Sequence, residues 1–281
     1  MAQELVGKPI ATAMREEILH QSRAYQQRGI NPKIAVISVG HDAAARAYVA
    51  SLKRVAEKLE ITFADVHLDP DTAKVHKRVA ALAADEHVHG IILALPFAKT
   101  IDAAAVYAQV PTDKDIDGLG AGQFGRLSAG EEEGVLAPAT PQACLALVEP
   151  IMSLKGADTV ILGRGKTVGR GLAAMLLNRH ATVSVCHSAT KNLADVTRRA
   201  DVIFSAAGNP GLLTRDHVRA GQIVIDAGVS IVDGALCGDA DFPAVAEVVS
   251  AITPSPGGVG PVTMAFVFAN LMKAVQIGAE S

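Results

Sequence analysis

The chain has 281 residues and a formal net charge of −3, so it is long enough for one or two domains with a sizeable core and lacks the basic excess typical of nucleic-acid-binding proteins. Hydrophobic residues make up 49% and aromatic residues 4%, so the core is expected to consist mainly of Ala, Val, Leu and Ile. Three scattered cysteines without a C-x-x-C pair, no basic N-terminal leader and no apolar run of ~18 residues favour a reducing cytosol and no zinc site, disulfide framework or membrane segment.

Alternating helix and strand patterns in the first hundred residues predict an α/β unit with a mainly parallel sheet. In chain order, the pattern predicts a helix at 9–28, a strand at 33–39, a helix at 42–59, a strand at 61–68, a helix at 72–85 and a strand at 90–95. His87 and His89 follow the third helix, and no acidic or cysteine partner is placed to complete a metal site with them. We therefore expect two solvated loop histidines.

A long irregular stretch, residues 110–141, separates this unit from a second one, and its acidic run at 131–133 is expected to be a solvated loop. The second unit is predicted to contain a helix from 140 to about 153, strands at 159–162, 181–185, 201–205, 222–226 and 251–253, and a long final helix that begins near 261 or 262. We accordingly predict two domains, one formed by residues 1–139 with the final helix 262–281, and one formed by residues 140–261.

A glycine-rich turn after the strand at 159–162 gives the strongest chemical signal in the chain. The apolar strand leads directly into Gly163, Gly165 and Gly169, and an Ala/Leu-rich helical segment follows at once. This order of strand, tight turn and helix start lets backbone N–H groups face an anionic phosphate, which points to a nucleotide cofactor. The third glycine comes one residue later than in the common G-x-G-x-x-G pattern, so a purely structural turn stays an alternative.

The next strand bears on the choice of cofactor. It ends at Cys186-His187-Ser188 and carries no acidic residue at this point, where NAD-binding folds usually place an Asp or Glu to hold the ribose 2′-hydroxyl. A hydroxyl, an imidazole and the nearby Arg164 suit a 2′-phosphate better, which favours NADP. The alternative is that His187 and Ser188 simply begin a loop.

The segment 254–261 contains three prolines and three glycines in eight consecutive residues. Prolines fix φ and glycines allow a ligand to approach the backbone closely, so the pattern favours a loop that lines a site. A rigid crossover between domains is the alternative.

Four motifs together resemble the FolD-type 5,10-methylenetetrahydrofolate dehydrogenase/methenyltetrahydrofolate cyclohydrolase family, in the family's order and across essentially the whole chain. They are Tyr48-Val49 after Gly40, Asp113-Lys-Asp-Ile-Asp-Gly118, Gly163-Arg-Gly-Lys-Thr-Val-Gly-Arg170 and Pro256-Gly-Gly-Val-Gly-Pro261. The resemblance implies an N-terminal α/β folate domain, a C-terminal Rossmann-type NADP domain, a cleft between them and a homodimer. A cytoplasmic location without nucleic-acid or membrane partners is expected from the charge, cysteine content and hydropathy given above.

The resemblance also implies roles for individual residues. The tyrosine matching Tyr48 stacks on the folate aminobenzoyl ring and the aspartate matching Asp117 hydrogen-bonds the pterin, so these two are the candidate catalytic residues. Pro256, Gly257 and Gly258 are expected to line the folate cleft. The expected cofactor-binding residues are Gly163, Arg164, Gly165, Val168, Gly169, His187 and Ser188, with Arg164 and Ser188 near the 2′-phosphate.

The departures from the family are equally informative. The family has a lysine four residues after the tyrosine, where this chain has Leu52, and a glutamine in the strand-end motif, where it has Ala94. Lys53 is adjacent, but one residue turns a helix by about 100°, so it does not face the same way. Smaller departures are Ala45 for serine, Gln123 for asparagine and Ala143 for glycine.

Lysine and glutamine serve the family's cyclohydrolase step, which must activate water and move protons, and such acid–base help is worth ~10²–10⁴ in rate. Dehydrogenation is a hydride transfer that depends chiefly on holding two ligands in line. We therefore expect an NADP-dependent methylenetetrahydrofolate dehydrogenase with weak or absent cyclohydrolase activity. Two alternatives stay open: a fully bifunctional enzyme in which Lys53 or another group substitutes, and a non-catalytic folate- or nucleotide-binding paralogue.

Overall fold

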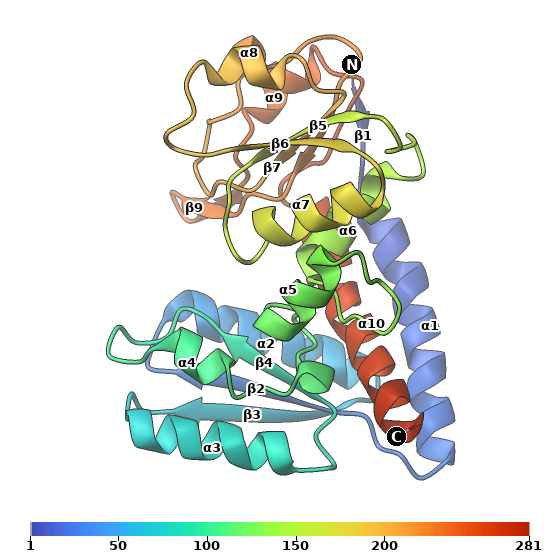
Figure 1. Ribbon diagram of the computed structural model, residues 1–281, viewed down its shortest axis with the longest axis vertical. Helices are drawn as coiled ribbons and strands as arrows, with labels where there is room; N and C mark the ends of the chain where they lie inside the picture. Colours follow the sequence, from blue (N-terminus) through green and yellow to red (C-terminus); the bar gives the residue numbers. More distant parts are fainter. Residues whose placement is uncertain (1, 281) are drawn as a thin grey trace. The chain divides into compact units, whose positions relative to one another are not determined.

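The computed structural model describes residues 2–280, which form two compact units that are each built around a parallel sheet (Figure 1). The three-stranded unit comprises residues 13–126, 131–137 and 267–280, and the six-stranded unit comprises residues 2–12, 127–130 and 138–266. Helices α1 (Lys8–Gln27) and α10 (Val259–Glu280) each contribute to both units. The predicted α/β class with mainly parallel sheets is confirmed.

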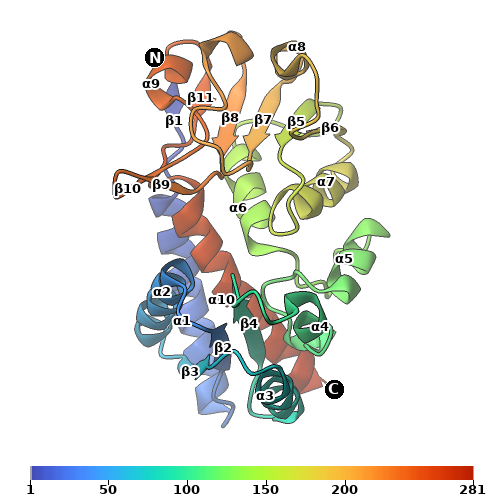
Figure 2. The same ribbon diagram turned by 90° about the vertical axis from the view of Figure 1, so that its left-hand side faces the viewer.

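The sheet of the three-stranded unit has the order β3-β2-β4. β2 spans Lys33–Val39, β3 spans Thr62–Leu68 and β4 spans Gly90–Ala94. Helix α2 (Ala43–Lys58) connects β2 to β3, and α3 (Thr72–Ala84) connects β3 to β4. Because the two crossovers run in opposite directions, right-handed connections place α2 and α3 on opposite faces of the sheet, as Figure 2 shows.

Side-chain alternation along β4 decides which residues share a face. Ile91 and Leu93 lie in one buried apolar cluster with Val75 and Val79 of α3. Residues that alternate with them, including Ala94, therefore point to the opposite face. Helix α2 packs against β4 on that face.

The six-stranded sheet has the order β1-β11-β8-β7-β5-β6, with every pair parallel. Its strands are β1 (Gln3–Glu4), β5 (Asp158–Leu162), β6 (Thr182–Cys186), β7 (Val202–Ser205), β8 (Ile223–Asp226) and β11 (Ala251–Ile252). β6 and β7 flank β5 on opposite sides, so the strand order reverses at β5. In open parallel sheets, ligands bind outside the carboxyl ends of the strands at such a point.

Short elements complete the two units. The helices are α4 (Ala103–Tyr107), α5 (Ala121–Ser128), α6 (Ala139–Val148), α7 (Gly169–Asn178), α8 (Leu193–Thr197) and α9 (Phe242–Ala246), with 3₁₀ turns at Thr112–Lys114 and Arg215–His217. An antiparallel hairpin joins β9 (Ser230–Val232) to β10 (Ala235–Cys237).

The sequence predictions need correction at several of these points. The stretch 110–141 is not irregular throughout, because it contains α5 and a 3₁₀ turn. The helix predicted to reach about residue 153 ends at Val148. Helix α10 begins at Val259, ahead of Pro261, because a proline is tolerated in the first helical turn, where its missing N–H would have no helical partner.

His87 is exposed, as expected, but the prediction for His89 was wrong. His89 is half-buried, and its Nδ1 accepts the backbone N–H of Lys33 at 3.2 Å. Burial, followed by the charge of Lys114, lowers the pKa of His89. Across residues 2–280, no group of three or more His, Cys, Asp or Glu side chains is placed to hold a metal ion.

Helix α10 is long and apolar enough to cross a membrane by length and composition, although no membrane segment is predicted from the sequence. Of its most apolar stretch, 50% is buried inside the protein, and the buried residues of the helix include Phe268, Leu271 and Val275. The core helix of a soluble protein meets the same criteria, so one such helix is weak evidence for a membrane span.

Candidate functional site

The glycine turn between β5 and α7 is built from glycines with different structural requirements. Gly163 has a φ of +110°, and a Cβ there would collide with the carbonyl oxygen of Ala206. A Cβ at Gly169 would collide with the carbonyl oxygen of Gly163. A Cβ at Gly165, by contrast, would meet no atom within 4 Å. The first and third glycines thus close the turn, while the middle one faces open space.

That open space belongs to a cavity of about 630 Å³ at the carboxyl ends of β5, β6 and β7. It is lined by Leu162, Gly163, Arg164, Gly165, Cys186, His187, Ser188, Thr190, Leu193, Ala206, Ala207, Asn209 and Leu212. The structure therefore brings five of the seven predicted cofactor residues to one cavity. Val168 and Gly169 do not line it, because Val168 is the N-cap of α7 and Gly169 packs against the turn.

The turn after β6 is held by its own side chains. The Thr190 hydroxyl accepts the backbone N–H of His187 at 2.9 Å, and His187 Nδ1 accepts the N–H of Ala189 at 3.2 Å. Ser188 and Arg164 are exposed at the cavity. Because this wall carries no carboxylate, while a guanidinium, an imidazole and a hydroxyl line the cavity, the donor set suits an anionic group.

In the three-stranded unit, α2 presents Tyr48. Asp42 caps the helix, since its carboxylate accepts the N–H of Ala45 at 2.9 Å. The buried face of α2 then follows helical spacing through Ala45, Val49, Leu52 and Ala56. Tyr48 lies half-buried beside this face, four residues before Leu52.

Asp117 lies in a turn that two other side chains hold in place. The Asp115 carboxylate is buried and accepts the N–H groups of Gly118 at 3.1 Å and Gly120 at 2.6 Å. The Asn270 amide donates to the carbonyl oxygen of Ile116 at 2.9 Å. Asp113 is exposed. The three aspartates of the motif therefore differ: Asp113 is solvated, Asp115 holds the turn, and Asp117 is half-buried.

The charge of Asp117 acts on Tyr48. Burial, followed by the charge of Asp115, raises the pKa of Asp117 to about 7, while a hydrogen bond from Tyr107 opposes the shift. Burial and the charge of Asp117 raise the pKa of Tyr48 well above its ordinary value. The structure thus brings both predicted catalytic residues together with Tyr107, which is not predicted from the sequence.

Leu52 and Ala94, the two apolar replacements, are both 0% exposed. Leu52 lies on the buried face of α2, and Ala94 ends β4 on the sheet face against which α2 packs. Lys53 is exposed, as expected from its rotation around the helix.

The Pro/Gly loop is held within the six-stranded unit. Gly257 has a φ of +114° and its carbonyl oxygen accepts the N–H of Gly7 at 2.9 Å, while the N–H of Gly258 donates to the carbonyl oxygen of Pro254 at 2.8 Å. Gly7 approaches this loop so closely that a Cβ would collide with the Gly258 carbonyl oxygen. The folate-lining role of Pro256, Gly257 and Gly258 stays a prediction.

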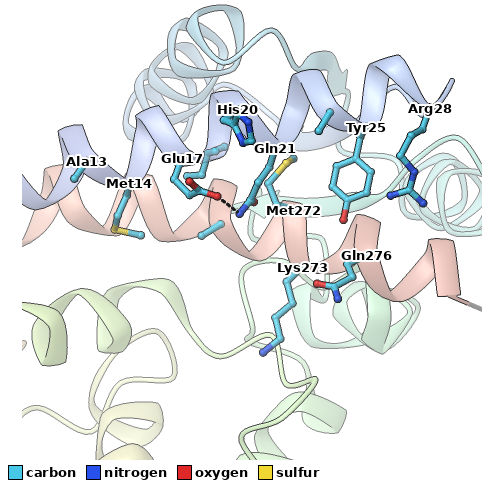
Figure 3. Close-up of a pocket in the computed structure, with 13 residues that line it drawn as sticks. Ala13, Met14, Glu17, His20, Gln21, Tyr25, Arg28, Met272, Lys273 and Gln276 are labelled. Carbon is cyan, nitrogen blue, oxygen red and sulfur yellow. Dashed lines mark hydrogen bonds between the residues drawn. The ribbon is translucent and has the colours of Figure 1, made fainter.

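A larger cavity, of about 890 Å³, lies between α1 and α10 (Figure 3). Its lining is mixed, with Met14 and Met272 beside Glu17, His20 and Arg28. None of the predicted site residues lines this cavity.

Comparison with known proteins agrees with these features. Residues 5–117 match the family model described as tetrahydrofolate dehydrogenase/cyclohydrolase, catalytic domain, and residues 138–279 match that of its NAD(P)-binding domain. The chain is 40% identical over 280 residues to "Bifunctional protein FolD 2" of Desulfitobacterium hafniense, covering 99% of this chain and 98% of that protein.

Two solved structures show the same fold. The bifunctional FolD methylenetetrahydrofolate dehydrogenase/cyclohydrolase of Campylobacter jejuni superposes with a TM-score of 0.95 at 36% identity, covering 99% of each chain. The FolD enzyme of Trypanosoma brucei, solved with NADP and an inhibitor, superposes with a TM-score of 0.94 at 29% identity, covering 100% of this chain and 99% of that one. This chain therefore belongs to the tetrahydrofolate dehydrogenase/cyclohydrolase (FolD) family, and its C-terminal part is the NAD(P)-binding domain of that family.

Proposed function

We propose that the protein oxidises 5,10-methylenetetrahydrofolate to 5,10-methenyltetrahydrofolate with NADP, and that its cyclohydrolase activity is weak or absent. When bound, NADP would supply the hydride acceptor for the hydrogen that leaves the folate methylene carbon with both electrons of its C–H bond. The protein's part is to bind and align two ligands, which requires no proton relay.

The main evidence for weak or absent cyclohydrolase activity is the burial of Leu52 and Ala94. At the two positions where the family resemblance implies a lysine and a glutamine, the chain has fully buried apolar side chains on one face of one sheet. Neither can hold or move a proton. Lys53 is exposed and turned away, which argues against its replacing the lysine.

NADP is favoured over NAD by the end of β6. His187 and Ser188 occupy the place of the usual acidic residue, and Arg164 lines the same cavity. In the three-stranded unit, Tyr48 and Asp117 are the residues proposed to bind the folate. Asp117, while ionised, accepts donors from the pterin edge and fixes the orientation of the ring.

A fully bifunctional enzyme is the second candidate, because the relatives from Desulfitobacterium hafniense and Campylobacter jejuni carry that description. One spectrophotometric experiment separates the candidates. NADPH formation from methylenetetrahydrofolate should be catalysed, while loss of the methenyl absorbance should run near its uncatalysed rate. Rapid enzyme-catalysed loss of the methenyl absorbance would refute the proposal that cyclohydrolase activity is weak or absent. Absence of NADPH formation would favour a non-catalytic paralogue.

We further propose a cytosolic homodimer without nucleic-acid or membrane partners. The β9–β10 hairpin exposes apolar side chains, with Ile231 69% and Leu236 52% exposed. Exposed apolar clusters of this kind mark association surfaces, and a second copy of the chain is the proposed occupant.

A further inference from the structure

Asp239 is buried, and its carboxylate accepts hydrogen bonds from one short segment, residues 205–209. It is 0% exposed. Its Oδ2 accepts the Ser205 hydroxyl at 2.8 Å and the backbone N–H of Ala207 at 2.7 Å. Its Oδ1 accepts the backbone N–H of Asn209 at 2.8 Å. A buried carboxylate is tolerated only when such donors are present, so the carboxylate and the segment fix each other.

The segment that Asp239 holds is a wall of the cofactor cavity. Residues 206–209 follow β7, and Ala206, Ala207 and Asn209 line the cavity. The Ala206 carbonyl also lies so close to Gly163 that no side chain fits there. The position of this short backbone segment therefore sets both the cavity width and the fit of the glycine turn.

The backbone around Asp239 is held in turn by Asp226. The Asp226 carboxylate accepts the backbone N–H groups of Asp239 at 3.1 Å and Ala240 at 2.8 Å. On the other side, a Cβ at Gly228 would collide with the Asp239 carboxyl group. The carboxyl group therefore cannot shift toward Gly228, and its hydrogen bonds fix the backbone of Ala207 and Asn209.

We propose that Asp239 is a positioning residue for the dinucleotide: its carboxylate fixes the 206–209 backbone as a wall of the cofactor cavity. This inference rests on the proposed function, because it takes the ligand of that cavity to be NADP. Asp239 does not line the cavity, so it would act on the cofactor only through the segment.

The direct test is Asp239→Asn. The amide keeps the size of the carboxyl group but has one acceptor oxygen instead of two, so an N–H donor of the segment must face the NH₂ group. Because bonds to charged groups are the stronger ones, calorimetry should show the Kd for NADP rising about tenfold or more. The Kd for a folate analogue should stay within about twofold of the wild-type value.

Gln222→Met is the matched control. Gln222 is also 0% exposed, and its amide donates to the carbonyl oxygens of Thr197 and Ala200, both at 2.7 Å, in the same unit. It precedes β8, away from the carboxyl ends of the strands, and does not line the cavity. This variant should lose thermal stability and keep its affinity for NADP. If Asp239→Asn binds NADP as the wild type does, or if Gln222→Met weakens NADP binding equally, the proposal is overturned.

A second measurement needs no variant. In NMR-detected hydrogen exchange of the wild type, the amides of Ala207 and Asn209 should exchange at least about tenfold more slowly than that of Gly208, which lies between them. Equal exchange would overturn the proposal. If the wild type shows this protection but binds no NADP, the proposed cofactor is wrong, and the proposed role of Asp239 in positioning it is refuted as well.

Discussion

Changing Leu52 to lysine and Ala94 to glutamine together should create cyclohydrolase activity. Both positions are fully buried, and both lie on the sheet face that α2 covers. The lysine would emerge from α2 one turn after Tyr48, and the glutamine would emerge from the end of β4. The two added groups would therefore share one face.

The burial of Leu52 determines the expected size of the effect. An ammonium introduced at a fully buried position loses hydration, which lowers a lysine pKa by up to 3–5 units from ~10.4. That shift brings it near neutral pH, where general acid–base catalysis is most effective and contributes ~10²–10⁴ in rate. Loss of the leucine burial should cost about 1.5–3 kcal/mol. The lowered lysine pKa should cost about 4–5 kcal/mol more at pH 7, so the Tm should fall by roughly ten degrees or more.

The assay follows methenyl absorbance with the wild type, both single variants and the double variant, after each Tm has been measured. Each single change should give much less than the double, because both groups act in one proton-handling step. Lys53→Ala serves as the control and should leave the slow wild-type rate unchanged. A folded double variant with no gain, or a wild type already far above the uncatalysed rate, would refute the reasoning.

Three further predictions concern single substitutions. Arg164→Ala should raise the KM for NADP about tenfold or more and leave NAD use nearly unchanged, because an arginine–phosphate contact is worth about 1.5–3 kcal/mol; equal losses with both cofactors would show that Arg164 does not read the 2′-phosphate. Asp117→Ala should abolish binding of a folate analogue in calorimetry, whereas the exposed Asp113→Ala should change it little; unchanged affinity in Asp117→Ala would exclude the pterin role. Ile231→Asp should convert a dimer to a monomer in light scattering without loss of fold, and a monomeric wild type would exclude the proposed interface.

The main strands of both units were predictable from sequence because their signals are strong and local. β2 is mostly apolar and buried from Ile34 to Val39, and its predicted bounds, Lys33–Val39, agree with the structure. The two-residue strand β1 was not predictable, because a segment that short has no periodicity and becomes a strand only by pairing with β11. The helix α5 was missed because its two glycines and polar residues resemble a loop.

The residues that line the cofactor cavity were predictable where they lie next to each other in a sequence motif. The glycine turn and the end of β6 are such cases, and five of the seven predicted residues line one cavity. Asp239 was missed because its partners are distant in sequence: it holds a segment about thirty residues earlier. Tyr107 was missed because it ends the short helix α4, outside the four motifs. Only the fold brings such pairs together.

The raised pKa of Asp117 leads to a prediction about pH. Burial, followed by the charge of Asp115, raises this pKa from 3.8 to about 7. Between these values the unfolded chain has released a proton that the folded protein still holds, so stability must fall as pH rises. The contribution of Asp117 is fully present below about pH 4 and is lost as pH rises through about 7.

A difference of about three units corresponds to a loss of up to about 4 kcal/mol. Asp117→Asn removes the titrating group and should flatten the profile by that amount, whereas Asp113→Asn, at an exposed position, should not. Urea unfolding at pH 4 and pH 8 measures the difference between wild type and each variant. If the wild type and Asp117→Asn lose equal stability over this range, Asp117 does not titrate near neutral pH. The same titration should strengthen folate binding as pH rises through about 7, because only the ionised carboxylate accepts every donor of the pterin edge.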